Sequence, residues 1–207
     1  MDTLFKGYMK FRREDFENHR DLFKQLGRTQ KPHTLFVGCS DSRVVPSLIT
    51  CTDPGELFIV RNVANIIPPY RVTEEYVSTT SAVEYAVEVL EVSSIVVCGH
   101  SNCGGCAAIN QSTEELAHIP HVRKWLEVSR DVRGRVDRLM TGDSPEEREW
   151  LTEQVNILVQ MKNLLTYPYV KKKFEAGRLK VYGWYYIIET GELFNFNDEK
   201  EVFELVC

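Results

Sequence analysis

Residues 33–39 read His-Thr-Leu-Phe-Val-Gly-Cys, and residues 93–99 read Ser-Ser-Ile-Val-Val-Cys-Gly. Both runs are short, apolar and rich in β-branched residues, which is typical of strands that are buried on both faces. A third run of this kind covers residues 56–62, and a helical pattern over residues 73–92 lies between it and the run at 93–99. Strands that alternate with helices predict an α/β fold with a central, mainly parallel β-sheet flanked by helices.

The chain after His100 predicts further helices and a closing hairpin. Helical patterns occupy approximately residues 103–110, 116–140, 145–166 and 168–176. Ser144 is a predicted N-cap, because a proline at the first helical position and a glutamate that completes a capping box follow it. Residues 179–188 and 192–196, joined by Glu189-Thr190-Gly191, predict a hairpin that adds an antiparallel C-terminal edge to the sheet.

The first 30 residues differ from the rest of the chain. Apolar residues recur at helical spacing among charges over residues 4–26, and Gly27 ends the pattern. We expect residues 1–30 to form an N-terminal helical arm that packs across a partner or against the outside of the domain. The remaining sequence has no linker or repeat, so residues 1–207 are expected to form a single domain.

The helix predicted over residues 73–92 is apolar on two sides. One stripe consists of Tyr76, Thr80, Val83, Val87 and Leu90, and the other of Ala82, Tyr85, Ala86 and Val89. A surface helix of a monomer normally has one apolar stripe. The second stripe therefore predicts contact with a second subunit, and the alternative is a helix that is buried within its own monomer.

The composition excludes several classes of protein. The net charge is −5 and the charges are mixed along the chain, so no nucleic-acid partner is expected. No apolar stretch approaches the roughly 18 residues of a membrane span, and the N-terminus does not resemble a signal peptide. Six unevenly spaced cysteines are too few for a disulfide scaffold. We expect a cytoplasmic protein with free thiols.

Three of the residues that follow the predicted strands are potential metal ligands. Cys39 ends the first apolar run, and His100 and Cys103 follow the third. The carboxyl ends of parallel strands meet at one edge of a sheet, so these side chains are expected to converge there. Two thiolates and an imidazole suit zinc, and three ligands leave a fourth position open for chemistry.

A potential proton acceptor lies next to these ligands in the sequence. Two thiolates neutralise the charge of zinc and make it a weaker Lewis acid, so a neighbouring acceptor would help. Asp41 can reach the fourth position, and Arg43 can keep its carboxylate ionised through a bidentate pair. The alternative role for Asp41 is reversible ligation of zinc, which would make activity depend on pH.

Other interpretations of the same residues remain open at this point. One alternative is a structural zinc with Cys39, Asp41, His100 and Cys103 as four ligands. Another is that Asp41 and Arg43 form only a local salt bridge in a turn. Cys103-Gly-Gly-Cys106 matches a redox CxxC motif, but that motif does not account for His100 or Cys39.

The combined motifs resemble the β-class carbonic anhydrases. These are Cys39-Ser-Asp-Ser-Arg43 and, about sixty residues later, His100-Ser-Asn-Cys103-Gly-Gly, supported by Pro54–Phe58 and Arg61–Asn65. The resemblance runs from about Gln30 to the final hairpin. It implies one zinc ion per subunit on Cys39, His100 and Cys103, with Asp41 and Arg43 as a catalytic dyad. The implied activity is reversible hydration of CO₂ to bicarbonate and a proton by zinc-bound hydroxide.

The resemblance also implies a substrate pocket and an assembly. Its pocket residues carry over to Gln30, Phe58, Val63, Tyr85 and Gly104. In the family this pocket lies at a dimer seam, which implies a homodimer or a dimer of dimers. Phe36 stands where a bicarbonate-regulated bacterial branch has tryptophan. With Gln30, it implies the plant-like active site without that inhibitory bicarbonate site.

Two rival functions are weighed against CO₂ hydration. One is hydrolysis of CS₂ or COS on the same scaffold, which substrate tests and a narrow tunnel to the pocket would distinguish. The other is a non-enzymatic interaction protein that is stabilised by a structural zinc site. A four-ligand site that stays closed at every pH would favour the second rival.

Overall fold

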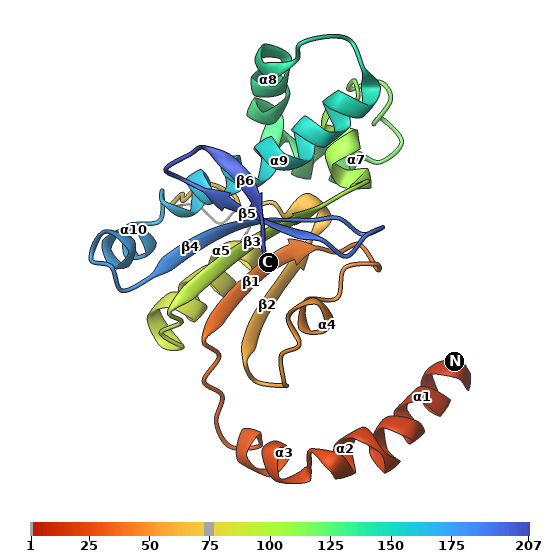
Figure 1. Ribbon diagram of the computed structural model, residues 1–207, viewed down its shortest axis with the longest axis vertical. Coiled ribbons are helices and arrows are strands. Elements are labelled where there is room, and N and C mark those ends of the chain that lie inside the picture. Colours follow the sequence, from red (N-terminus) through yellow and green to blue (C-terminus); the bar gives the residue numbers. More distant parts are fainter. Residues whose placement is uncertain (1, 73–76) are drawn as a thin grey trace.

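The computed structural model describes residues 2–72 and 77–207 and contains a six-stranded sheet with the order β2-β1-β3-β4-β5-β6 (Figure 1). The strands are β1 (Thr34–Cys39), β2 (Leu57–Asn62), β3 (Ser94–His100), β4 (Lys180–Tyr186), β5 (Leu193–Asn197) and β6 (Val202–Leu205). Strands β1 to β4 pair in parallel, and β4, β5 and β6 pair antiparallel. The predicted α/β fold with an antiparallel C-terminal edge is confirmed.

Three short elements among the described residues were not predicted. They are the five-residue helix α4 (Pro46–Thr50), the 3₁₀ turn η1 (Val63–Asn65) and the four-residue strand β6. Each is too short for its apolar residues to repeat often enough to reveal a helix or a strand in a sequence.

Helices account for most of the remaining described chain. They are α5 (Val77–Glu84), a π-helical turn η2 (Tyr85–Val89), α6 (Gly104–Ile109), α7 (Pro120–Leu126), a 3₁₀ turn η3 (Glu127–Ser129), α8 (Arg130–Leu139), α9 (Pro145–Leu164) and α10 (Pro168–Glu175). The pattern at 116–140 is therefore three consecutive pieces. Residues 73–76 of the predicted 73–92 helix, including Tyr76, lie outside the described residues.

The N-terminus of α9 matches its prediction, with one difference. The Ser144 hydroxyl accepts a hydrogen bond from the backbone N–H of Glu147 at 3.2 Å, as an N-cap does. The Glu147 carboxylate, however, accepts from the backbone and hydroxyl of Thr141. The carboxylate therefore holds the preceding loop, whereas a capping box would direct it to the N-cap residue.

One face of the sheet carries the main core. Helices α5, α9 and α10 contribute to a buried cluster with the strands, whose members include Leu35, Val37, Ile95, Val97 and Ile157. A second cluster lies among α6, α7, α8 and α9, and it contains Cys39 and Cys103. The predicted ligands therefore lie where this second cluster meets the carboxyl ends of β1 and β3.

The other sheet face is covered only in part within one chain. Phe36, Val96 and Cys98 are buried there, and the half-buried residues Leu57, Tyr182, Trp184 and Tyr186 pack against them. We call this surface the aromatic sheet face.

The predicted N-terminal arm consists of α1 (Asp2–Arg13), α2 (Asp15–Asn18) and α3 (Arg20–Leu26). It extends away from the sheet, and none of its described helical residues is buried (Figure 1). Its apolar residues Leu4, Phe5, Tyr8 and Met9 are exposed. None of the described helices has the length and apolar character needed to cross a membrane.

Close approach of α9 to the sheet depends on glycine. A Cβ atom at Gly183 of β4 would lie 2.5 Å from the Met161 sulfur and 3.0 Å from Ile157. A Cβ atom at Gly99 of β3 would lie 2.8 Å from Ile157. Both strands therefore use a residue without a side chain where the helix crosses them.

We predict that Gly183→Ala destabilises the protein by about 1–3 kcal/mol, because the added methyl overpacks the contact with α9. Urea denaturation of the variant and the parent protein measures the difference. Gly142→Ala is the matched control, since a Cβ atom there meets nothing within 4 Å. Equal stability of the Gly183 variant and the parent would contradict the prediction.

Candidate metal centre

The three predicted ligands come together at the carboxyl ends of two neighbouring strands. Cys39 is the last residue of β1 and His100 the last of β3, and these strands pair directly. Cys103 follows in the loop before α6. The ligand atoms of the three residues lie within 4.8 Å of one another, and all three residues are buried. The two sulfur atoms are 3.9 Å apart.

His100 is oriented for a bond through one ring nitrogen. Its Nδ1 lies 2.9 Å from the Ser101 carbonyl oxygen, to which it can donate. That bond fixes the ring and leaves Nε2 as the acceptor. Nε2 is buried and has no hydrogen-bond partner within the described chain. A buried polar atom without a partner is costly, and a metal ion would satisfy it.

Both thiols lie in surroundings that favour the protonated form when no cation is present. The neighbouring Cys103 thiol and burial raise the pKa of Cys39 to about 12. The Cys106 thiol beside it, with burial, raises the pKa of Cys103 to about 12. Both must lose a proton to become ligands, and a bound cation drives that loss. Two thiols and an imidazole nitrogen form a donor set that fits zinc.

Asp41 lies beside the three ligands and is held by Arg43. Arg43 Nε and Nη2 donate to the two carboxylate oxygens at 3.0 and 2.8 Å, and its backbone N–H donates to Oδ1 at 2.9 Å. These bonds hold the pKa of Asp41 well below its usual range, and those from the Arg43 side chain have the largest effect. Asp41 Oδ2 is 3.9 Å from His100 Nε2. A low pKa makes this carboxylate a permanent hydrogen-bond acceptor.

Arg43 also contacts residues 101–103, which connect β3 to α6 and which we call the ligand loop. Its Nη2 donates to the Asn102 carbonyl oxygen at 2.9 Å, next to Cys103 in the chain. Arg61, from β2, donates to the backbone carbonyls of Cys39 and Asp41 at 3.0 and 2.6 Å. Two arginines therefore fix the backbone on both sides of the ligand group. Arg61 belongs to one of the sequence motifs, but these contacts were not predicted from the sequence.

Val63 and Gly104 lie close to the ligand loop. Gly104 begins α6, and a Cβ atom placed on it meets nothing within 4 Å, so the space over it is open. A Cβ atom on the next residue, Gly105, would lie 2.9 Å from Val63 Cγ1. Val63 is partly exposed at this position.

The other three predicted pocket residues lie away from the chain's own ligand group. Phe58 pairs in register with Leu35, four residues before Cys39, which is about 13 Å along the strand. The Tyr85 ring packs against Phe58, with centroids 5.9 Å apart. Gln30 is exposed in the segment that precedes β1. All three belong to the amino-terminal side of the sheet, whereas the ligands are at its carboxyl ends.

One buried residue of this region, Glu153, was not predicted from the sequence. Glu153 of α9 accepts a hydrogen bond from the Cys103 backbone N–H at 2.8 Å. The sequence nevertheless contains a signal for such a residue. Four polar residues lie along one side of an otherwise amphipathic helix and are all buried: Thr152, Glu153, Asn156 and Gln160. Polar residues on a buried helix face need internal partners.

Known proteins resemble this chain over nearly its whole length. A family model described as carbonic anhydrase matches residues 34–193. The carbonic anhydrase of Helicobacter pylori strain J99 is 39% identical over 203 residues, which cover 97% of this chain and 92% of that protein. The solved β-carbonic anhydrase CcaA superimposes with a TM-score of 0.95 at 39% identity, covering 100% of this chain and 92% of the other. A tetrameric β-carbonic anhydrase of Sordaria macrospora gives 0.75 at 30% identity, covering 95% and 93%.

We predict that zinc affinity rises with pH between 6.5 and 8.5, by up to about 100-fold for each unit, because two thiol protons are released for each ion bound. Competition with a chelator at each pH measures the affinity. Cys103→Ser should lose most of the metal, and Cys51→Ser, at an exposed thiol, should bind like the parent. An affinity that does not change with pH would exclude two protonated thiol ligands.

Proposed function

The chain belongs to the β-class carbonic anhydrase family and is a carbonic anhydrase, and we propose that it hydrates CO₂ reversibly at a zinc site formed by Cys39, His100 and Cys103. The observation that carries this assignment is the buried group of two thiols and an unpartnered imidazole nitrogen, all within 4.8 Å. One zinc ion per chain satisfies all three atoms. A zinc ion with three protein ligands lowers the pKa of water to about 7 and so supplies a nucleophile at neutral pH.

In this proposal Asp41 is a hydrogen-bond acceptor that orients the attacking water. Its lowered pKa keeps the carboxylate ionised near neutral pH, so Asp41 accepts a hydrogen bond but does not take up the proton. Arg43 occupies both carboxylate oxygens, which favours this role over ligation of the metal. The position of Asp41 beside His100 supports an open site with three protein ligands.

The bound CO₂ would lie between Asp41 and the loop that begins α6. Val63 supplies an apolar wall there, and Gly104 offers a backbone amide next to open space for the bicarbonate that forms. Attack on CO₂ rearranges few bonds, so positioning supplies much of the rate enhancement. Gln30, Phe58 and Tyr85 are proposed to complete the pocket from a second copy of the chain.

A twofold dimer through β2 would bring those three residues to the neighbouring site. Strand β2 is an edge of the sheet, and next to it Tyr85 and Val89 are 44% and 60% exposed. A twofold axis that is perpendicular to the strands at this edge would make the two β2 strands antiparallel. The amino end of one strand, with Phe58, then lies next to the carboxyl end of the other, with its zinc ligands.

The same arrangement provides a place for the N-terminal arm. The arm has exposed apolar residues, and the aromatic sheet face has half-buried ones. We infer that the arm of residues 1–30 crosses onto the aromatic sheet face of the partner, and that residues 1–207 otherwise act as one catalytic domain. A pair of such dimers would form a tetramer.

Two finer assignments belong to the same proposal. Phe36 is buried, with its ring 6.1 Å from that of Trp184, which supports the plant-like site without an inhibitory bicarbonate site. The six cysteines are free thiols, as is typical of a reducing compartment, and this supports a cytoplasmic location.

We predict that Asp41→Asn retains zinc but lowers CO₂ hydration by roughly 100- to 10,000-fold, because the amide cannot act as the charged acceptor. Stopped-flow hydration with a pH indicator, on protein of known zinc content, measures the loss. Asp137→Asn is the matched control, since Asp137 pairs with Arg148 at 2.6 Å on the surface. An active Asp41 variant would remove this residue from the mechanism. A fully zinc-loaded parent without CO₂ hydration would redirect the tests to CS₂ and COS.

We predict that the protein in solution has a mass of at least twice 23.9 kDa and that Val89→Asp lowers this mass, because it places a charge on the proposed interface. Light scattering after gel filtration measures both masses. Val206→Asp, next to the opposite edge strand, is expected to leave the dimer intact. A parent protein with the mass of a single chain would contradict the dimer.

A further inference from the structure

Glu153 connects the ligand loop to two elements that supply no ligand. Its Oε1 accepts from the Cys103 backbone N–H at 2.8 Å, and its Oε2 accepts from the Tyr185 hydroxyl at 2.6 Å. Glu153 belongs to α9 and Tyr185 to β4. The two residues are 2% and 3% exposed. Cys103 is therefore tied through one carboxylate to a helix and a strand from the C-terminal half of the chain.

The loop that carries Cys103 needs this kind of support. Asn102, directly before it, has a φ of 55°, a conformation that few residues other than glycine adopt. Arg43 holds the Asn102 carbonyl, and Glu153 holds the next N–H along the chain. Without Glu153, the N–H of a nearly inaccessible residue would lose its partner. The two bonds together fix the turn that presents the Cys103 sulfur.

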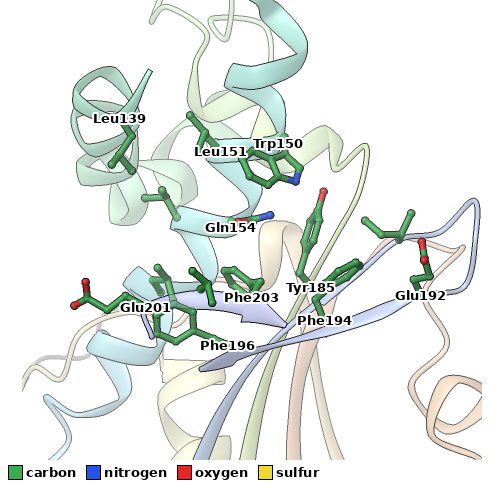
Figure 2. Close-up of a pocket in the computed structure, with 14 residues that line it drawn as sticks. Leu139, Trp150, Leu151, Gln154, Tyr185, Glu192, Phe194, Phe196, Glu201 and Phe203 are labelled. Carbon is green, nitrogen blue, oxygen red and sulfur yellow. The ribbon is translucent and has the colours of Figure 1, made fainter. Parts of the chain in front are cut away.

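Tyr185 keeps Glu153 in place from the other side. Burial, together with the adjacent carboxylate, raises the pKa of Tyr185 above its ordinary value, so its hydroxyl stays protonated and donates. The ring also lines an apolar cavity of about 650 Å³ between α8, α9 and the C-terminal strands (Figure 2). Trp150, Phe194 and Phe203 line the same cavity. The Tyr185 ring is 3% exposed and packs against Phe203, with centroids 6.3 Å apart, so packing and the hydroxyl bond together fix its position.

We propose that Glu153 and Tyr185 are positioning residues of the metal centre, which hold Cys103 in the geometry of a ligand before the metal binds. The proposal rests on the metal site assigned under the proposed function and adds two residues to it. The Cys39 and Cys103 sulfurs are 3.9 Å apart, so the positioned loop places both within reach of a single ion. Partners of this kind, one step beyond the ligands, typically contribute 10- to 100-fold to metal affinity.

The test compares zinc affinity in conservative variants of the zinc-free protein. Tyr185→Phe keeps the ring and removes only the hydroxyl, and we expect a loss of about 10-fold in affinity. Glu153→Ala removes both bonds, with an expected loss of about 100-fold. Glu153→Gln retains an amide oxygen for the Cys103 N–H and should recover part of that loss. Tyr182→Phe is the control, since Tyr182 lies on the aromatic sheet face.

Two further readouts separate positioning from general destabilisation. Absorption of the cobalt(II)-substituted protein reports the thiolate–metal geometry, and its charge-transfer bands should shift in Tyr185→Phe but not in Tyr182→Phe. Circular dichroism of the zinc-free protein should show that Tyr185→Phe and Tyr182→Phe are both folded at the temperature of the affinity measurement, so that a loss of affinity is not a loss of folded protein. If Glu153→Ala does not fold, Tyr185→Phe and Glu153→Gln carry the test.

The proposal is overturned if Tyr185→Phe and Glu153→Gln bind zinc as tightly as the parent with unchanged cobalt bands. It is also overturned if Tyr182→Phe loses as much affinity as Tyr185→Phe. A failure of the proposed function would look different, because the parent protein itself would then fail to bind zinc or to hydrate CO₂. The ratio between variant and parent affinities tests the two positioning residues alone.

Discussion

The parallel pairing of β1 with β3 is the constraint on which the rest of this structure depends. It places Cys39 and His100 at the same edge of the sheet, each as the last residue of its strand. The next few residues after these strands then supply Asp41 and Arg43 after β1, and Cys103 and Gly104 after β3, while Arg61 and Glu153 contact the group from other elements. A slip of one strand by one residue would reverse the side on which its own residue projects.

Arg43 serves two parts of the site with one guanidinium group. The same Nη2 atom donates to the Asp41 carboxylate and to the carbonyl before Cys103. The acceptor for the reaction and the loop of the third ligand are therefore aligned with each other by a single planar group. Lysine has no such fork, so it would not hold both oxygens of the Asp41 carboxylate in one plane.

The sequence predicted the parallel sheet, its antiparallel edge and the convergence of Cys39, His100 and Cys103, because these depend on apolar runs and residue types that are local in the chain. It did not predict α4 or β6, which are too short for an apolar pattern to repeat often enough to reveal them. Glu153 was missed for a different reason. Its partners lie 50 and 32 residues away, and only the packing of α9 on the sheet brings them together. Gln30, Phe58 and Tyr85 came from family resemblance alone, since one chain does not bring them to its own ligands.

The tie between Glu153, Tyr185 and Cys103 has a consequence for biosynthesis. All three proposed metal ligands are synthesised within the first half of the chain, yet the residues proposed to position the last of them are in its second half. A chain that is still growing can bring Cys39 and His100 together but has not yet acquired α9 or β4. Pairings between distant parts of a chain form late, because the connecting loop must first be closed. In the proposed zinc site, the metal would therefore meet a finished site only after synthesis is nearly complete, which would make metal acquisition one of the last steps of maturation.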